Sequence, residues 1–232
     1  MVNVFVKTFL FSLVILAGCA NPDQKEVLKS GHFLYYLDYR VWGEEGKPNA
    51  TILVQLRQGG AEGPAVLLEK PARIELDGEL FHADSTPLTG VFYELVKPVE
   101  QLEGRHTIVL TDEEGNKFKE EFEFNPFRIE PELPPVLPKK AFSIKLSHFP
   151  KQKTKVLLSV TDTAFETNDI NELVSVNKAQ LEITETMLQR LKAGPVFFEL
   201  YKEEERIIEK SGATVGRLWV SYGLRRELEL AN

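Results

Sequence analysis

The sequence has very little cysteine and no excess of basic residues, which excludes several kinds of structure and partner. Among its 232 residues there is one cysteine, Cys19. A single cysteine excludes an intramolecular disulfide and a zinc site built from several thiolates. The chain also has no excess of basic residues, because 28 Lys and Arg stand against 35 Asp and Glu and the formal net charge is −7. Nucleic-acid binding needs a concentrated basic surface, so this composition argues against a nucleic-acid partner.

The apolar run near the start of the chain is too short to cross a bilayer as a helix. It covers residues 9–17 and is interrupted only by Ser12, whereas a transmembrane helix needs about 20 apolar residues. Lys7 precedes the run and supplies a short positive region. This pattern is typical of a secretory signal peptide, which we assign to residues 1–18.

The junction that follows reads Leu16-Ala17-Gly18-Cys19 and resembles the lipobox of bacterial lipoproteins. In that family the cysteine thiol is acylated with diacylglycerol, the peptide is cut just before it, and the new N-terminus usually receives a further chain such as palmitate. The resemblance implies lipidation of Cys19 and anchoring by several acyl chains, which is stable where one chain is not.

The residues after the cysteine bear on where such a lipoprotein is sorted. In enteric bacteria an Asp directly after the cysteine retains lipoproteins in the inner membrane, and this chain has Ala20 there. The resemblance therefore implies an outer membrane lipoprotein of the bacterial cell envelope, facing either the periplasm or the exterior. Residues 19–31 are polar, and we expect them to form a flexible tether.

From Gly31 onward the dominant hydrophobic period is two, which predicts β-strands. Residues 33–42 alternate large apolar side chains with mostly polar ones. Residues 117–124 place phenylalanines between lysines and glutamates, as expected for a strand with one buried and one solvated face. Asp77-Gly78 is a residue pair that favours tight hairpin turns.

A change in composition predicts a boundary between two domains. Residues 126–138 hold five of the 13 prolines. Since proline cannot donate a hydrogen bond into a sheet, we predict an extended linker over residues 128–140. Residues 32–127 and 141–232 then form the two domains. Within the second, residues 184–195 predict one short helix with a capping box formed by Thr186 and Gln189.

Short strands spaced by about 8–15 residues indicate β-sandwiches. Each half resembles the immunoglobulin-like group in size and pattern. Residues 102–115 resemble the end of such a domain, with His106 at the position of the usual tyrosine. The cysteine pair of the antibody-type branch is absent. The predicted fold class is therefore all-β, with two immunoglobulin-like β-sandwich domains in tandem and one short helix in the second.

The sequence contains no recognisable catalytic motif. None of its four histidines shares the spacing of a metal site, and nucleophile-elbow and phosphate-binding motifs are absent. We predict no catalytic residue and no enzyme activity. The candidate metal site is the loop at residues 161–172, where calcium could find hard oxygen ligands, unless the loop is simply solvated. Its candidate ligands are Asp162, Glu166, Asn168 and Asp169.

Two aromatic residues are candidates for ligand binding. Tyr36 and Trp42 lie in the first predicted strand and could stack against sugar rings, or they could belong to the core or edge of a sandwich.

Three functions follow from these observations. The first is a non-enzymatic, lipid-anchored envelope protein that acts as an interaction, adhesion or assembly module, with another envelope protein or a polysaccharide as its partner. The alternative is a carbohydrate-binding surface lipoprotein, with or without help from Ca²⁺. The third is a secreted hydrolase whose carboxylate pair is not evident in the sequence. No other cofactor is predicted.

Overall fold

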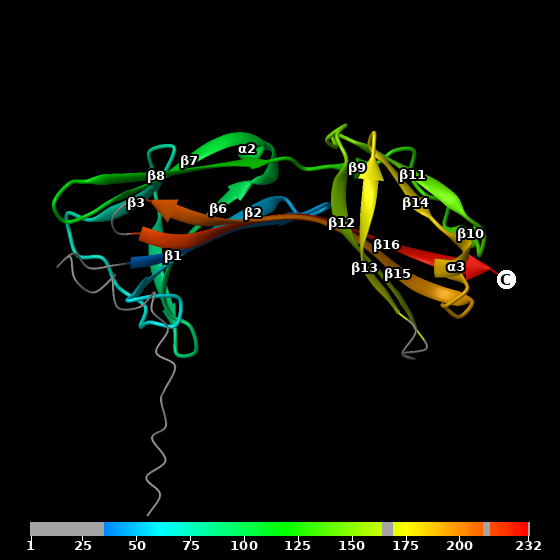
Figure 1. Ribbon diagram of the computed structural model, residues 1–232, viewed down its shortest axis with the longest axis horizontal. Helices are drawn as coiled ribbons and strands as arrows, with labels where there is room; N and C mark the ends of the chain where they lie inside the picture. The colour runs from blue at the N-terminus through cyan, green and yellow to red at the C-terminus, as the bar shows by residue number, and fades with distance from the viewer. Residues whose placement is uncertain (1–34, 164–168, 211–213, 232) are drawn as a thin grey trace, which may run out of the picture. The chain divides into compact units, whose positions relative to one another are not determined.

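The computed structural model describes residues 35–163, 169–210 and 214–231, and β-strands dominate them (Figure 1). The described residues form sixteen strands and two helices of one turn each. The prediction of an all-β fold is confirmed. Within these ranges no helix combines the length and apolar character needed to span a membrane.

The first half of the chain supplies two sheets. The larger one has the neighbour order β5-β6-β2-β1, and the smaller one has the order β4-β3-β7-β8. Asp77 and Gly78 both have positive φ, 50° and 91°, and connect β3 to β4 as predicted. The strands are β1 (Tyr35–Glu44), β2 (Asn49–Gln58), β3 (Arg73–Leu76), β4 (Glu79–Leu80), β5 (His82–Thr86), β6 (Gly90–Pro98), β7 (Gly104–Thr111) and β8 (Lys117–Phe124).

The second half adds shorter strands to the same larger sheet, in the order β12-β13-β14-β11-β9. Residues 128–140 contain β9, at the end of this order, and the separate strand β10. Each is only two or three residues long, which is consistent with proline being confined to sheet edges. These strands are β9 (Arg128–Ile129), β10 (Val136–Pro138), β11 (Phe142–Ser147), β12 (Thr154–Asp162), β13 (Ile170–Asn177) and β14 (Gln180–Ile183).

A long hairpin of β15 (Gly194–Lys210) and β16 (Thr214–Ala231) joins the two sets of strands (Figure 1). The first part of β16 pairs in parallel with β1, and its last residues pair with β10. β15 pairs with β12 through only its first part, Val196–Tyr201. The predicted domains 32–127 and 141–232 stay a prediction, and the structure adds that a strand from residues 141–232 completes a sheet of residues 32–127.

The two helices differ from the expectation in number and in capping. α3 (Glu185–Leu188) confirms the predicted helix, but its N-cap is Thr184, whose side chain accepts a hydrogen bond from the Met187 amide at 3.3 Å. The capping box at Thr186 and Gln189 is therefore wrong by two residues. α2 (Val99–Leu102) was not predicted, because a single turn is too short to show a 3.6-residue period.

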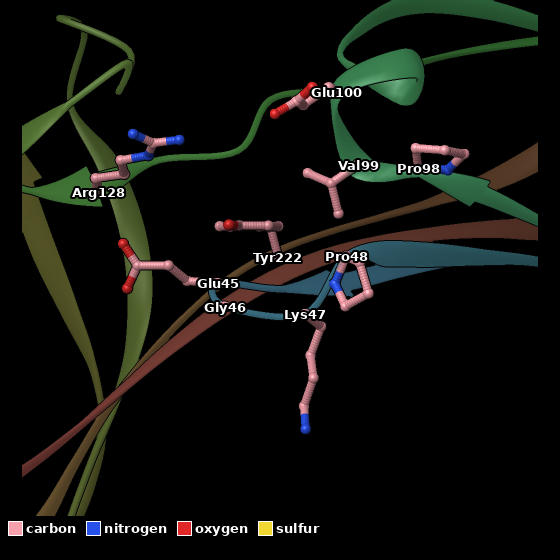
Figure 2. Close-up of a pocket in the computed structure, with 9 residues that line it drawn as sticks. All are labelled: Glu45, Gly46, Lys47, Pro48, Pro98, Val99, Glu100, Arg128 and Tyr222. Carbon is pink, nitrogen blue, oxygen red and sulfur yellow. The ribbon is translucent and has the colours of Figure 1, made fainter.

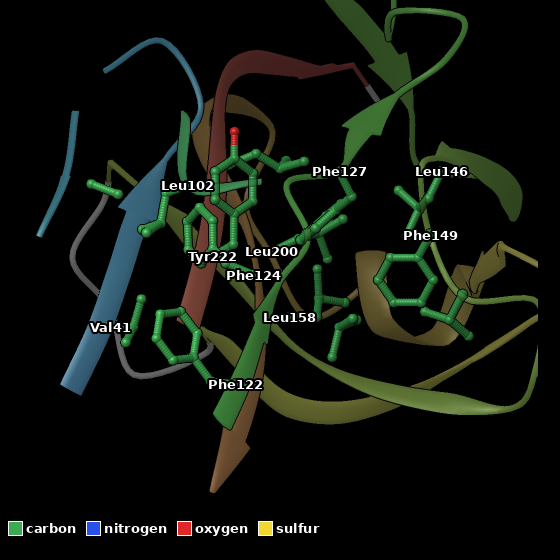
Figure 3. Packing of buried hydrophobic residues seen from close by; sticks show 14 of the residues in the cluster. Val41, Leu102, Phe122, Phe124, Phe127, Leu146, Phe149, Leu158, Leu200 and Tyr222 are labelled. Atoms are coloured by element: carbon green, nitrogen blue, oxygen red, sulfur yellow. The ribbon is translucent and has the colours of Figure 1, made fainter. Parts of the chain in front are cut away.

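The core follows the period-two pattern of the sequence. On β1 and β2 the buried hydrophobic side chains alternate along each strand, as predicted, and two buried polar residues, Asp38 and Gln55, lie between them. Aromatic rings fill a further part of the core, where Phe127 lies edge-on to both Phe149 and Tyr222 with ring centroids 5.2 and 5.6 Å apart (Figure 3). Phe124 contacts Tyr222 in the same way at 5.8 Å.

Candidate functional site

The side of β1 that faces away from the core carries a row of polar and aromatic side chains. Successive side chains of a strand point to opposite faces, so the burial of Leu37, Tyr39 and Val41 in the core places the intervening residues on the other face. The parallel register pairs Asp38 with Arg217 and Arg40 with Trp219 of β16. We call the following set the outer face: Tyr36, Asp38, Arg40 and Trp42 of β1, with Arg217 and Trp219 of β16.

Asp38 is the centre of the outer face. It is only 4% exposed, and its carboxylate accepts four hydrogen bonds from two guanidinium groups. Arg40 donates from Nε at 3.1 Å and from Nη2 at 2.6 Å, and Arg217 donates from Nε at 2.9 Å and from Nη2 at 3.1 Å. Charge-assisted bonds of this kind are stronger than neutral ones, so Asp38 fixes the position of both arginines.

The electrostatics of this cluster favour the charged forms of Asp38 and Arg217. Burial raises the pKa of Asp38, but the hydrogen bonds from Arg217 and Arg40 outweigh burial and hold the pKa below its ordinary value. The hydrogen bond to Asp38 raises the pKa of Arg217 further. The arginine side chains stay 45% and 37% exposed, so each guanidinium is bound to Asp38 on one side and reaches solvent on the other.

The aromatic members of the outer face are half-buried. Within the part of the chain that the structure describes, Trp42 and Trp219 take part in no contact between aromatic rings. The neighbouring strand β15 places Glu205 opposite Trp219 and Ile207 opposite Arg217. Glu205 Oε1 lies 3.7 Å from Arg217 Nη1, so a carboxylate borders Arg217 on this side.

The structure brings both candidate ligand-binding residues, Tyr36 and Trp42, onto this one face. The sequence analysis missed the four other members. Asp38 and Arg40 could have been found from strand alternation, because they lie between Tyr36 and Trp42. Arg217 and Trp219 gave no such signal, since Asp38 and Arg217 are 179 positions apart in the chain.

The remaining predicted site residues are only partly described. Cys19, Glu166 and Asn168 lie outside the described residues. The carboxylate of Asp162 is buried and accepts a hydrogen bond from the Lys192 amide at 3.0 Å. Asp169 is exposed. The residues described contain no group of three or more His, Cys, Asp or Glu side chains that could hold a metal ion, and the calcium site stays a prediction.

A shallow pocket of about 480 Å³ lies elsewhere, beside the turn between β1 and β2 (Figure 2). Burial, followed by the charge of Glu45, raises the pKa of Tyr222 to about 12, so its hydroxyl stays protonated at neutral pH. Glu45 itself is ion-paired with Arg226. The lining contains no Ser, Cys or His that could act as a nucleophile, and consists of Glu45, Gly46, Lys47, Pro48, Pro98, Val99, Glu100, Arg128 and Tyr222.

Comparison with known proteins gives only distant structural similarities. No family model matches the chain, and no curated protein matches it. Similar solved structures include the first two immunoglobulin domains of DIP-gamma, with 11% identity, a TM-score of 0.26, and coverage of 83% of this chain and 96% of that one. Titin domains A168–A170 match with 11% identity, a TM-score of 0.25, and coverage of 86% and 66%. Scores this low carry no argument about fold or function.

Proposed function

We propose that this protein is a non-enzymatic, lipid-anchored component of the bacterial envelope that binds another envelope component through the outer face. The observation that carries the proposal is the buried carboxylate of Asp38, which orients two arginines that remain accessible to solvent. A binding surface gains affinity when its polar groups are already held in place before the partner arrives.

The chemistry of the outer face favours binding over catalysis. A general acid or base works best when its pKa lies near the operating pH. Hydrogen bonds from the arginines hold the pKa of Asp38 below its ordinary value, and the carboxylate oxygens are occupied by these same bonds. Asp38 is therefore suited to positioning its neighbours, while the arginines and aromatic rings are the groups that a partner can reach.

The envelope location rests on the sequence Leu16-Ala17-Gly18-Cys19. We expect Cys19→Ser to abolish incorporation of labelled palmitate and to release the protein from the membrane fraction, because a hydroxyl does not replace the thiol that forms the thioether. The matched control is Ser12→Ala within the apolar run, which keeps the cysteine. Palmitate labelling that survives Cys19→Ser would refute the lipid anchor.

Binding through the outer face is tested in cells with the full chain. A benzophenone amino acid placed at Ile207, which is 62% exposed and pairs with Arg217, should form a specific photo-crosslink to an envelope component. The control position is Leu173 on β13, which is equally accessible at 65% exposed. The absence of adducts at Ile207, or the same adducts from both positions, would contradict the proposal.

A further inference from the structure

The aromatic side chains of the outer face lie along the direction of β1. Tyr36 and Trp42 are six residues apart on the same face, which corresponds to about 20 Å at the rise of a β-strand. Trp219 stands on the next strand beside Arg40, between these two ends. The three rings therefore mark an elongated site, longer than a single small molecule needs.

The polar groups between and beside the rings include both donors and acceptors of hydrogen bonds. Arg40 and Arg217 donate, and Asp38 holds them in fixed positions. On β15, the exposed carboxylates of Glu203 and Glu205 accept, and they pair in the sheet with Ser221 and Trp219 of β16. A ligand that complements this arrangement must itself both donate and accept, and the hydroxyl group does both.

The charges on this side of the sheet indicate whether its ligand is charged or uncharged. On this side of β6, β2, β1, β16 and β15, acidic side chains outnumber basic ones. The resulting negative charge disfavours a polyanion, and the fixed arginines disfavour a cationic partner. The charged members near the aromatic rings include the arginines Arg40, Arg57 and Arg217 and the carboxylates Asp38, Glu44, Glu94, Glu203, Glu205 and Glu209.

We infer that the outer face binds an uncharged polysaccharide chain, whose sugar rings pack on Tyr36, Trp42 and Trp219 and whose hydroxyls bond to Arg40 and Arg217. This inference rests on the proposed function and names the class of its ligand. Aromatic rings suit the apolar faces of sugars because they offer a large, rigid surface. The half-buried state of these rings means that little side-chain motion is lost on binding.

The inference is tested by affinity electrophoresis of the full chain in detergent. The probes are hydroxyethyl cellulose, dextran, laminarin and mannan, which are uncharged, and carboxymethyl cellulose, which has the backbone of the first but carries anionic groups. We expect retardation by at least one uncharged polymer. The affinity for that polymer should fall about five- to tenfold in Trp42→Ala and in Trp219→Ala.

The matched control is Phe197→Ala, which removes an aromatic ring that lies under Arg225 at 4.0 Å, outside the outer face. Its affinity should equal that of the unchanged chain, and circular dichroism checks that each variant is folded. Preference for carboxymethyl cellulose, or equal loss in Phe197→Ala, would overturn the inference. If no polymer retards the chain while Ile207 still crosslinks to a protein, the polysaccharide inference is wrong and the proposed function stands. If the chain shows neither retardation nor crosslinks, the inference and the proposed function are both refuted.

Discussion

The two faces of β1 bury side chains by different means. On the inner face Tyr39 is 2% exposed and packs in the hydrophobic core. On the outer face Asp38 is 4% exposed, yet what covers it is the pair of arginines that bind its carboxylate. The same degree of burial thus reflects apolar packing on one face and hydrogen bonding on the other. The first stabilises the fold, and the second also prepares a surface for binding.

The largest expected effect distinguishes the faces by removing the same side chain from each. Tyr39→Ala should lower the free energy of unfolding by about 3–5 kcal/mol, because it leaves a cavity in the core. Tyr36→Ala, three residues earlier and half-buried, should cost about 1 kcal/mol or less. Urea unfolding of both variants measures the difference. Equal losses would show that the outer face is packed as tightly as the core.

A smaller effect comes from the carboxylate of Asp38. Asp38→Asn should cost about 2 kcal/mol at pH 7, because two charge-assisted interactions lose their charge. Since the folded-state pKa of Asp38 is lowered, its contribution is present above the unfolded-state pKa and is lost as the pH falls through the folded-state pKa.

The pH dependence of the unfolding free energy checks this sign. Between pH 7 and pH 3 the stability of the unchanged chain should fall more steeply than that of Asp38→Asn. Asp84→Asn on the exposed strand β5 is the control and should follow the unchanged chain. Parallel curves for Asp38→Asn and the unchanged chain would mean that the ionised carboxylate adds no stability.

The smallest effect separates charge from geometry on the outer face. Arg40→Lys keeps the charge but replaces a planar fork with a single ammonium group, so one of the two bonds to Asp38 is lost. We expect a loss of about 1 kcal/mol in thermal or urea unfolding. The exposed Arg105, changed to Lys, should shift stability by less than about 0.5 kcal/mol. A loss as large as that of Asp38→Asn would indicate that the fork geometry dominates the cluster.

The inner face of β1 was predictable from sequence, and much of the outer face was not. The alternation of residues 33–42 predicted a strand with one apolar face, because one buried face imposes a period of two. The structure buries Leu37, Tyr39 and Val41 of that face in the core. The burial of Asp38 depends on Arg217 as well as Arg40, and no local pattern indicates that two such distant segments pair in parallel. The turn at Asp77 and Gly78, by contrast, was predictable, because its geometry depends on two adjacent residues and on no distant segment.

The pairing of β1 with β16 also sets an order of events when the chain is made. Asp38 leaves the ribosome 179 residues before Arg217. One edge of β1 therefore stays unpaired until residues 214–223 have been synthesised. An unpaired strand edge is a template for wrong association, and such intermediates are prone to aggregate. For the export proposed above, the late pairing of β1 favours translocation before folding, because the larger sheet cannot form early and block the passage of the remaining chain.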